Sequence, residues 1–133
     1  QLELNIQDAT NNFANFIGEF WFNIIEKKTG AFIGAIGFMI RDGTVPYFEI
    51  GYWLQTSQTG FGYVSEAIRI IEEYAFIQKG AKRIEIRMAG SNLKSRAVAK
   101  RCGYQLEDRF ANARRLPSGD LDSTLVYAKT SLS

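Results

Sequence analysis

The stretch TGFGYVSEA, residues 59–67, joins the end of a strand pattern to the start of a helix pattern through two glycines. Glycine lets the backbone bend close to a ligand, and the first turn of a helix leaves N–H groups without intrahelical partners. Such a junction is suited to bind the phosphate groups of a ligand. A Gly-x-Gly pair alone more often makes only a tight turn, so the rest of the sequence has to decide between the two interpretations.

Two common nucleotide-binding motifs do not fit this junction. A nucleoside-triphosphate loop continues its second glycine with Lys and then Ser or Thr, whereas Gly62 is followed by Tyr63. A dinucleotide-binding fingerprint needs Gly or Ala three residues after the second glycine, and this position is Ser65. Neither motif is therefore predicted.

The composition restricts the classes of function. A chain of 133 residues with 46% apolar and 23% charged residues fits one globular domain. A formal net charge of +2, from 16 basic and 14 acidic residues, is too balanced to indicate a nucleic-acid partner. The absence of histidine excludes catalytic triads and the commonest metal ligand. With a single cysteine and no apolar run long enough to cross a bilayer, we expect a cytoplasmic protein without a membrane partner.

Hydrophobic patterning predicts an α+β domain. The expected strands are residues 20–27, 31–40, 47–54, 82–88, 105–114 and 124–129, and the expected helices are residues 7–17, 63–78 and the segment from Asn92 to Gly103. The long helix carries a predicted apolar stripe of Ala67, Ile70, Ile71, Tyr74 and Ile77. Because this helix connects the third strand to a strand of alternating apolar and charged residues, those two strands are expected to be parallel neighbours in a mixed sheet.

Three motifs in register resemble one superfamily. They are EIGYWL at residues 49–54, GFGYVSEA at residues 60–67 and NLKSRAVAKRCGY at residues 92–104. Together they resemble the GNAT acyl-CoA N-acyltransferases, within these the ribosomal-protein alanine and serine N-terminal acetyltransferases, over roughly residues 20–129. The resemblance implies a GNAT-like, mostly antiparallel mixed sheet flanked by helices, with a central parallel strand pair splayed for coenzyme binding.

The resemblance also implies acetyl-CoA as cosubstrate and no metal. Its diphosphate would be held by backbone N–H groups at the glycine junction. Thr59 replaces the usual Arg or Gln and Val64 the usual Gly or Ala, changes that should weaken rather than abolish binding by backbone donors. The expected coenzyme contacts are Trp53, Leu54, Gln55, Thr59, Gly60, Phe61, Gly62, Tyr63, Val64, Asn92 and Ser95.

The end of the third strand resembles the segment that pairs with pantetheine. Its backbone near Leu54 and Gln55 would offer an N–H to the thioester oxygen. For the coenzyme to enter, this strand must separate from its parallel neighbour, and we expect a bulge near Gly51 or Trp53 to separate them.

Two residues match catalytic positions of the superfamily. Glu49 is the expected general base, because its carboxylate lies on the strand face of Tyr47, Gly51 and Trp53, among aromatics where it is poorly hydrated. The tyrosine that many members use as general acid corresponds to Ala99, and Ser95 is expected to assist the leaving thiolate instead, although water could suffice.

Several points stay open in the sequence. The acceptor amine is a protein N-terminus, as the branch implies, or a small molecule, and an assembly of two copies is conceivable. A non-catalytic acyl-CoA-binding module is the alternative, suggested by Thr59, Val64 and Ala99. The segment before the first hairpin is short for the family, which could reflect truncation of the single domain that spans residues 1–133. Cys102 is interpreted as a packing residue, and Arg101 is left out of the expected site.

Overall fold

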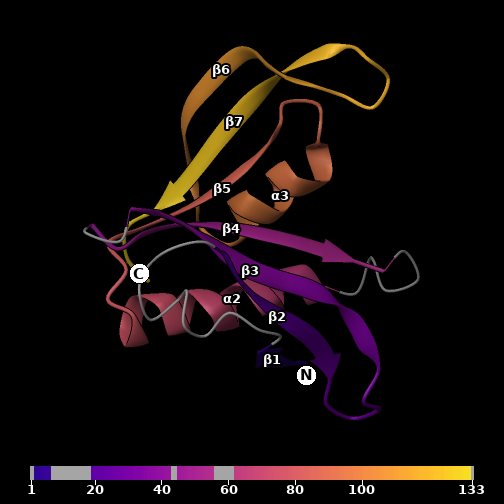
Figure 1. Ribbon diagram of the computed structural model, residues 1–133, viewed down its shortest axis with the longest axis vertical. Helices are drawn as coiled ribbons and strands as arrows, with labels where there is room; N and C mark the ends of the chain where they lie inside the picture. Colours follow the sequence, from indigo (N-terminus) through magenta and orange to yellow (C-terminus); the bar gives the residue numbers. More distant parts are fainter. Residues whose placement is uncertain (1, 7–18, 43–44, 56–61, 133) are drawn as a thin grey trace.

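The computed structural model describes residues 2–6, 19–42, 45–55 and 62–132, and the predicted helix at 7–17 and residues 59–61 of the glycine junction lie outside these ranges. The described residues form one seven-stranded sheet with the order β1-β2-β3-β4-β5-β7-β6, and its two helices pack on the same face (Figure 1). The elements are β1 (Leu2–Ile6), β2 (Glu19–Glu26), β3 (Phe32–Asp42), β4 (Tyr47–Leu54), α2 (Tyr63–Glu73), a π-helical turn (Tyr74–Gln78), β5 (Arg83–Ala89), α3 (Leu93–Arg101), β6 (Gln105–Arg115) and β7 (Leu121–Lys129).

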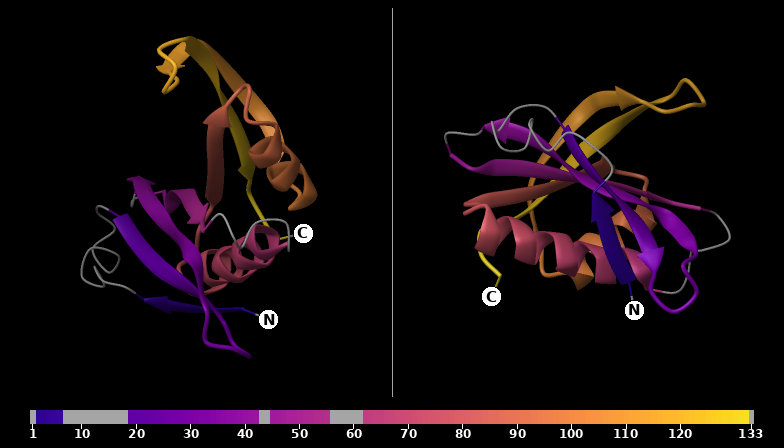
Figure 2. Two further views of the ribbon diagram at one scale, coloured as in Figure 1. Left: turned by 90° about the vertical axis from the view of Figure 1, so that its right-hand side faces the viewer. Right: turned by 60° about the horizontal axis from the view of Figure 1, so that its bottom comes forward.

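The predicted mixed sheet is confirmed. β4 and β5 pair in parallel, with α2 as the crossover between them, and each of the other neighbouring pairs in this sheet is antiparallel. The two further views in Figure 2 show both helices on one side of the sheet, and the described residues place no helix on the opposite face of the central strands. The two faces of the sheet therefore meet different surroundings.

Apolar side chains on the helix face form the core. They alternate along the strands, as expected for strands with one face packed against helices. The fully buried members include Ile36, Phe38, Phe48, Ile50, Ile84 and Ile86 from the strands and Ile68 and Ile71 from α2. This packing fixes α2 and β4 relative to each other, and the glycine junction connects these two elements.

The last turn of the long helix departs from the sequence prediction. The Lys79 N–H donates to the carbonyl of Tyr74, five residues back, at 3.2 Å. The extra residue in this π-helical turn rotates the following side chains around the helix axis. Ile77, predicted on the buried stripe, is consequently 64% exposed, while Ala75 is buried. Gly80, with φ of +65°, ends the segment as predicted.

The second helix begins and ends where the sequence predicts. The Asn92 side chain accepts the N–H of Ser95 at 3.1 Å and caps α3, and Gly103 follows it with φ of +87°. Leu93, however, is 68% exposed, and Ala99 is the buried residue of the helix. α3 thus packs through a small side chain, which lets it lie close to β5.

A buried polar cluster connects α2 to β7 and to the segment that precedes β6. Glu72 on α2 accepts hydrogen bonds from the Tyr104 hydroxyl at 2.8 Å and from Lys129 Nζ on β7 at 3.0 Å. Burial, together with the Glu72 charge, raises the pKa of Tyr104, so the phenol stays protonated and donates. These hydrogen bonds satisfy the acceptor oxygens of the Glu72 carboxylate, which is 4% exposed. They also fix the position of α2 on the sheet.

Candidate active site

The central parallel strands separate after a short pairing. β4 and β5 are in register from Tyr47↔Arg83 to Ile50↔Ile86, and within the described residues no pairing continues beyond Ile50. β4 goes on to Leu54, whereas the rest of β5 pairs only with β7. The predicted gap between the two strands is therefore present.

The gap between β4 and β5 is not caused by the predicted bulge. Pairing of β4 with β3 is uninterrupted from Gly34↔Leu54 to Ile40↔Phe48, so neither Gly51 nor Trp53 is an extra residue. The strands separate because β5 turns with β7 and β6 away from β1–β4 (Figure 1), as the twist of a sheet allows without an insertion.

The backbone at the end of β4 leaves one of the two expected donors facing the gap. The N–H of Gln55 donates to the carbonyl of Ile33 at 2.9 Å, so it is engaged within the sheet. Residues of an antiparallel pair alternate between pointing their backbone groups at the partner strand and away from it. The backbone of Leu54 therefore points toward the gap, and Leu54 rather than Gln55 is placed to meet a ligand there.

The described end of the glycine junction has the conformation that glycine allows. Gly62 is the N-cap residue of α2 with φ of +74° and ψ of +11°, in the left-handed region, and an added Cβ would meet nothing within 4 Å. Glycine is thus required by the backbone angle and not by crowding. The first N–H groups of α2 follow immediately, while Thr59, Gly60 and Phe61 lie outside the described residues.

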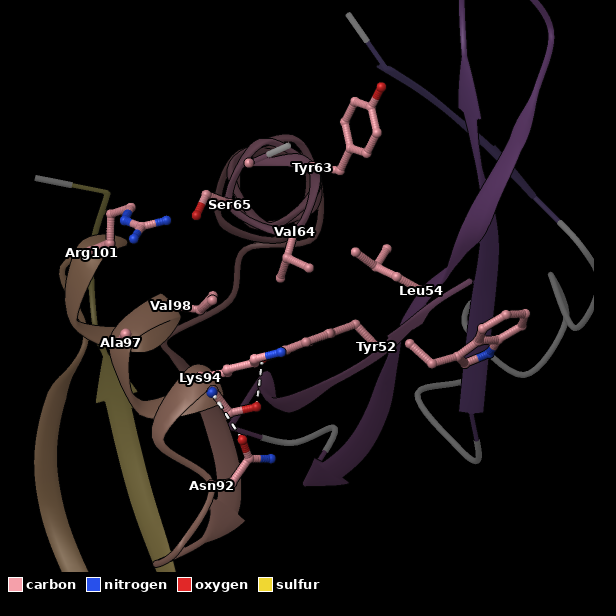
Figure 3. Close-up of a pocket in the computed structure, with 13 residues that line it drawn as sticks. Tyr52, Leu54, Tyr63, Val64, Ser65, Asn92, Lys94, Ala97, Val98 and Arg101 are labelled. Carbon is pink, nitrogen blue, oxygen red and sulfur yellow. Dashed lines mark hydrogen bonds between the residues drawn. The ribbon is translucent and has the colours of Figure 1, made fainter. Parts of the chain in front are cut away.

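A pocket of about 650 Å³ opens at this helix start. It lies between the first turn of α2, α3 and the end of β4, as Figure 3 shows. Seven of the predicted coenzyme contacts line it: Trp53, Leu54, Gly62, Tyr63, Val64, Asn92 and Ser95. Residues from segments about 40 positions apart in the sequence are thereby brought together at one site.

Sequence reasoning missed part of the lining. The additional residues are Tyr52, Ser65, Lys94, Ala97, Val98 and Arg101. Among the described residues that line this pocket, Lys94 and Arg101 are the charged ones, and both are cations. A positive pocket at a helix N-terminus favours an anionic ligand. Periodicity on α3 could have identified Arg101, because it follows Lys94 and Val98 at helical spacing.

Ser95 has a hydroxyl partner from the neighbouring strand. The Tyr52 hydroxyl lies 2.9 Å from Ser95 Oγ, across the gap from β4 to α3 (Figure 3). Burial raises the pKa of Tyr52. Ala99, at the position of the expected family tyrosine, is fully buried, and the phenol that contacts Ser95 belongs to Tyr52 on β4.

Glu49 lies on the opposite face of the sheet, at the start of the gap. It is directly opposite Glu85 in the parallel register, and both carboxylates are buried. Arg41 donates to Glu49 Oε1 from Nε at 2.9 Å and also from Nη2, and Arg87 Nε lies 3.9 Å from the same oxygen. Two arginines thus contact this carboxylate, a feature that the sequence prediction of aromatic surroundings did not include.

Glu85 is the more fully engaged of the two carboxylates, and the sequence pattern missed it. Its oxygens accept from the Tyr47 hydroxyl, from Arg83 Nε and Nη2, and from Arg87 Nε. Burial alone would raise the pKa of Glu85, but these hydrogen bonds outweigh it and hold the pKa below its usual value. Among the described residues, by contrast, nothing donates to Glu49 Oε2. Glu49 is therefore the carboxylate with an oxygen available to a ligand.

Three further features of the molecule bear on competing chemistry. Cys102 is buried, and burial raises the pKa of its thiol, in agreement with the predicted packing role. In the part of the chain that the structure describes, no helix is long and apolar enough to span a bilayer. No group of three or more acidic or cysteine residues in these ranges is arranged to hold a metal ion.

Comparison with known proteins identifies the family. A family model described as an acetyltransferase (GNAT) domain matches residues 2–105. The probable N-acetyltransferase YjcK of Bacillus subtilis is 32% identical over 90 residues, which are 67% of this chain and 50% of that protein. The ribosomal-protein-serine acetyltransferase of Escherichia coli is 35% identical over 104 residues, 77% of this chain and 56% of that protein. The chain thus spans about half the length of the curated relatives it matches.

Solved structures share the fold. The crystal structure of a probable acetyltransferase aligns with a TM-score of 0.80 and 26% identity, over 91% of this chain and 66% of that one. The microcin self-immunity acetyltransferase MccE, solved in complex with acetyl-CoA and AMP, aligns with a TM-score of 0.76 and 32% identity, over 91% and 64% of the two chains. With the separated parallel strands and the pocket at the start of α2, these matches show that the chain belongs to the GNAT acetyltransferase domain family.

Proposed function

We propose that this chain is the catalytic domain of an N-acetyltransferase that moves acetyl from acetyl-CoA to a primary amine by direct attack. One observation carries the proposal: β4 and β5 separate one residue beyond Glu49 and Glu85, between a cationic pocket on the helix face and a carboxylate on the other. A donor bound on one face and an acceptor on the other would meet in this gap.

The pocket fits the coenzyme in shape and charge. The first N–H groups of α2, at Tyr63 and Val64, would bind the diphosphate, and Lys94 and Arg101 supply positive charge beside it. The Leu54 backbone would pair with pantetheine in the gap. Bound there, the coenzyme supplies a thioester with a thiolate leaving group, and the surrounding residues hold it in place.

Glu49 is the proposed general base. An ammonium group must lose a proton before it can attack the thioester carbonyl. Glu49 Oε2 is available for that proton, directly or through one water, while Arg41 fixes the carboxylate through Oε1. Glu85 is unsuited to this role because both of its oxygens accept hydrogen bonds already.

Ser95 is the proposed partner of the leaving sulfur. Its backbone is fixed by the Asn92 cap, and its side chain lines the pocket next to the gap. A hydroxyl at this place would donate a hydrogen bond to the thiolate as the C–S bond breaks. Water is the alternative source of the proton that finally neutralises the sulfur.

The proposed acceptor is the α-amine of a protein N-terminus. The match to the ribosomal-protein-serine acetyltransferase of Escherichia coli supports this choice over a small-molecule amine. We place the domain in the cytoplasm, and assembly into a homodimer stays a prediction.

A two-step experiment tests the function. Acetyl-CoA at a hundredfold excess over its Kd should raise the melting temperature by roughly 10 °C. Free thiol should then appear on addition of a peptide with an N-terminal serine or alanine, but not with the same peptide N-acetylated. Spermidine and free amino acids complete the panel. Coenzyme binding without thiol release from any amine would contradict the proposal and favour a non-catalytic acyl-CoA-binding module.

A further inference from the structure

The hydroxyl pair of Tyr52 and Ser95 bridges the two elements that border the gap. Tyr52 lies on β4 two residues beyond the last residue paired with β5, and Ser95 lies in the first turn of α3. Their oxygens are 2.9 Å apart, and both side chains line the pocket. The hydrogen bond therefore spans the place where the thioester of a bound coenzyme would pass.

The number of hydroxyl protons limits what this pair can do. Each hydroxyl donates one hydrogen bond, and either oxygen could be the donor in this contact. If Ser95 donated to Tyr52, its single proton would be unavailable to a third atom. If Tyr52 donates, the Ser95 proton is free to point at a ligand atom in the pocket.

The chemistry of the two groups favours Tyr52 as the donor. A phenol is a stronger acid, and so a better hydrogen-bond donor, than an aliphatic hydroxyl. Burial raises the pKa of Tyr52, so its hydroxyl stays protonated across neutral and moderately alkaline pH. Ser95 can be turned only by its side-chain torsion, because its backbone N–H is held by the Asn92 cap.

We propose that Tyr52 is a positioning residue that donates to Ser95 Oγ and thereby aims the Ser95 proton at the sulfur of the departing thiolate. The inference rests on the proposed function and deepens it. The amine nitrogen forms a bond to the acetyl carbon, the C–S bond breaks, and its electron pair goes to sulfur. Ser95 donates a hydrogen bond to that sulfur, and both hydroxyls keep their own protons. The acceptor ammonium loses two protons by way of Glu49 and solvent, one before and one after the attack, and of these one finally neutralises the sulfur while the other is released to water.

The test compares coenzyme A with desulfo-coenzyme A, in which the thiol is replaced by hydrogen. Calorimetric titrations at pH 6.5 and pH 9 measure the affinity for each compound, and no acceptor is needed. The wild-type protein should prefer coenzyme A about tenfold at pH 9, where a larger fraction of the free thiol is ionised, and much less at pH 6.5. Tyr52→Phe should lose most of this preference while its affinity for desulfo-coenzyme A stays within about twofold.

Two further variants separate positioning from folding. Ser95→Ala should lose the preference to the same extent, and the double variant should lose no more than either single one, because both hydroxyls act through one hydrogen bond. Tyr74→Phe, a half-buried tyrosine packed against Phe22 outside this pocket, should keep the wild-type preference. Melting temperatures confirm that each variant is folded.

The outcomes are distinguishable. Preference retained in Tyr52→Phe, or absent from a wild-type protein that binds both compounds, would overturn the positioning role and leave the proposed function standing. Failure of the folded wild-type protein to bind either compound would overturn both.

Discussion

The two faces of the sheet at the gap are built from different chemistry. The helix face offers backbone N–H groups, hydroxyls and two peripheral cations, around Gly62, Tyr52 and Ser95. The opposite face, on which the described residues place no helix, is the open face. It carries buried carboxylates held by arginines, with Glu49 and Glu85 side by side. The helix face is suited to bind an anion without a buried cation. The open face is suited to hold a carboxylate in a fixed orientation through arginine side chains.

This difference separates binding from proton transfer. Backbone donors at a helix start bind a phosphate whatever side chains surround them. A carboxylate that must accept a proton depends on the orientation of specific neighbours, here above all Arg41. Substitutions on the open face should therefore change catalysis or stability, and substitutions on the helix face should change coenzyme affinity.

The largest effect is expected on the open face at Glu49. Glu49→Gln keeps the size of the side chain but removes the base, so kcat should fall about 100-fold or more, the range of general base catalysis. Steady-state thiol release with a peptide acceptor measures the rate, and calorimetry should show a Kd for acetyl-CoA within about twofold of wild type. An unchanged kcat would remove Glu49 from the catalytic role.

Glu85 should instead matter for stability, and in a pH-dependent way. Because its pKa is lowered in the folded protein, its ionised form stabilises the fold above the unfolded pKa, and this stabilisation is lost as the pH falls through the folded pKa. Glu85→Gln should cost about 2 kcal/mol at pH 7, the scale of hydrogen bonds to a charged group. Urea unfolding should show the difference from wild type shrinking as the pH falls below about 4.

The matched control is Glu107→Gln on β6. Glu107 pairs with Arg83, as Glu85 does, but its side chain is 44% exposed. Exposed ion pairs contribute little, so the cost should stay below about 1 kcal/mol. An equal loss in the free energy of unfolding for the two variants, or a loss for Glu85→Gln that is independent of pH, would contradict a stabilising role of the buried Glu85 network.

An effect smaller than that at Glu85 is expected at the glycine junction. Gly62→Ala forces a side chain into the left-handed region and should cost about 1 kcal/mol of stability and up to about tenfold in coenzyme affinity. Gly30→Ala is its control, because Gly30 has φ of +76°, also has no atom within 4 Å of an added Cβ, and lies in the turn before β3. It should lose similar stability without changing the coenzyme Kd; equal loss of affinity in both variants would contradict a local role for Gly62.

Local patterns in the sequence were sufficient for strands β2 to β7 and for both ends of α3, whereas β1 at Leu2–Ile6 was not expected. The turn at Gly103, the Asn92 cap and the parallel strand pair each follow from residues near one another in the chain. The resemblance added Glu49 and Ser95 as candidate catalytic residues, whose roles stay predictions. Elements with a strong local signal are predictable because their geometry is decided within a few residues.

The features that the sequence did not predict depend on contacts between distant segments. Tyr52 and Ser95 are 43 positions apart, and no spacing rule predicts their hydrogen bond. Alternation assigned Glu85 to a polar face but could not show that arginines and a tyrosine would bury it. The predicted bulge was wrong because sheet twist, a property of all the strands together, already separates β4 from β5.

A crystal structure of the protein with acetyl-CoA tests the central claim most directly, through the distance from the thioester carbon to the Glu49 carboxylate. We expect the thioester in the gap beyond Ile50 and Ile86, with its sulfur beside Ser95 on the helix face and Glu49 about 6 Å or less away, the span of one bridging water. A thioester bound elsewhere, or a sheet that stays closed between it and Glu49, would contradict the claim that the two faces meet through this gap.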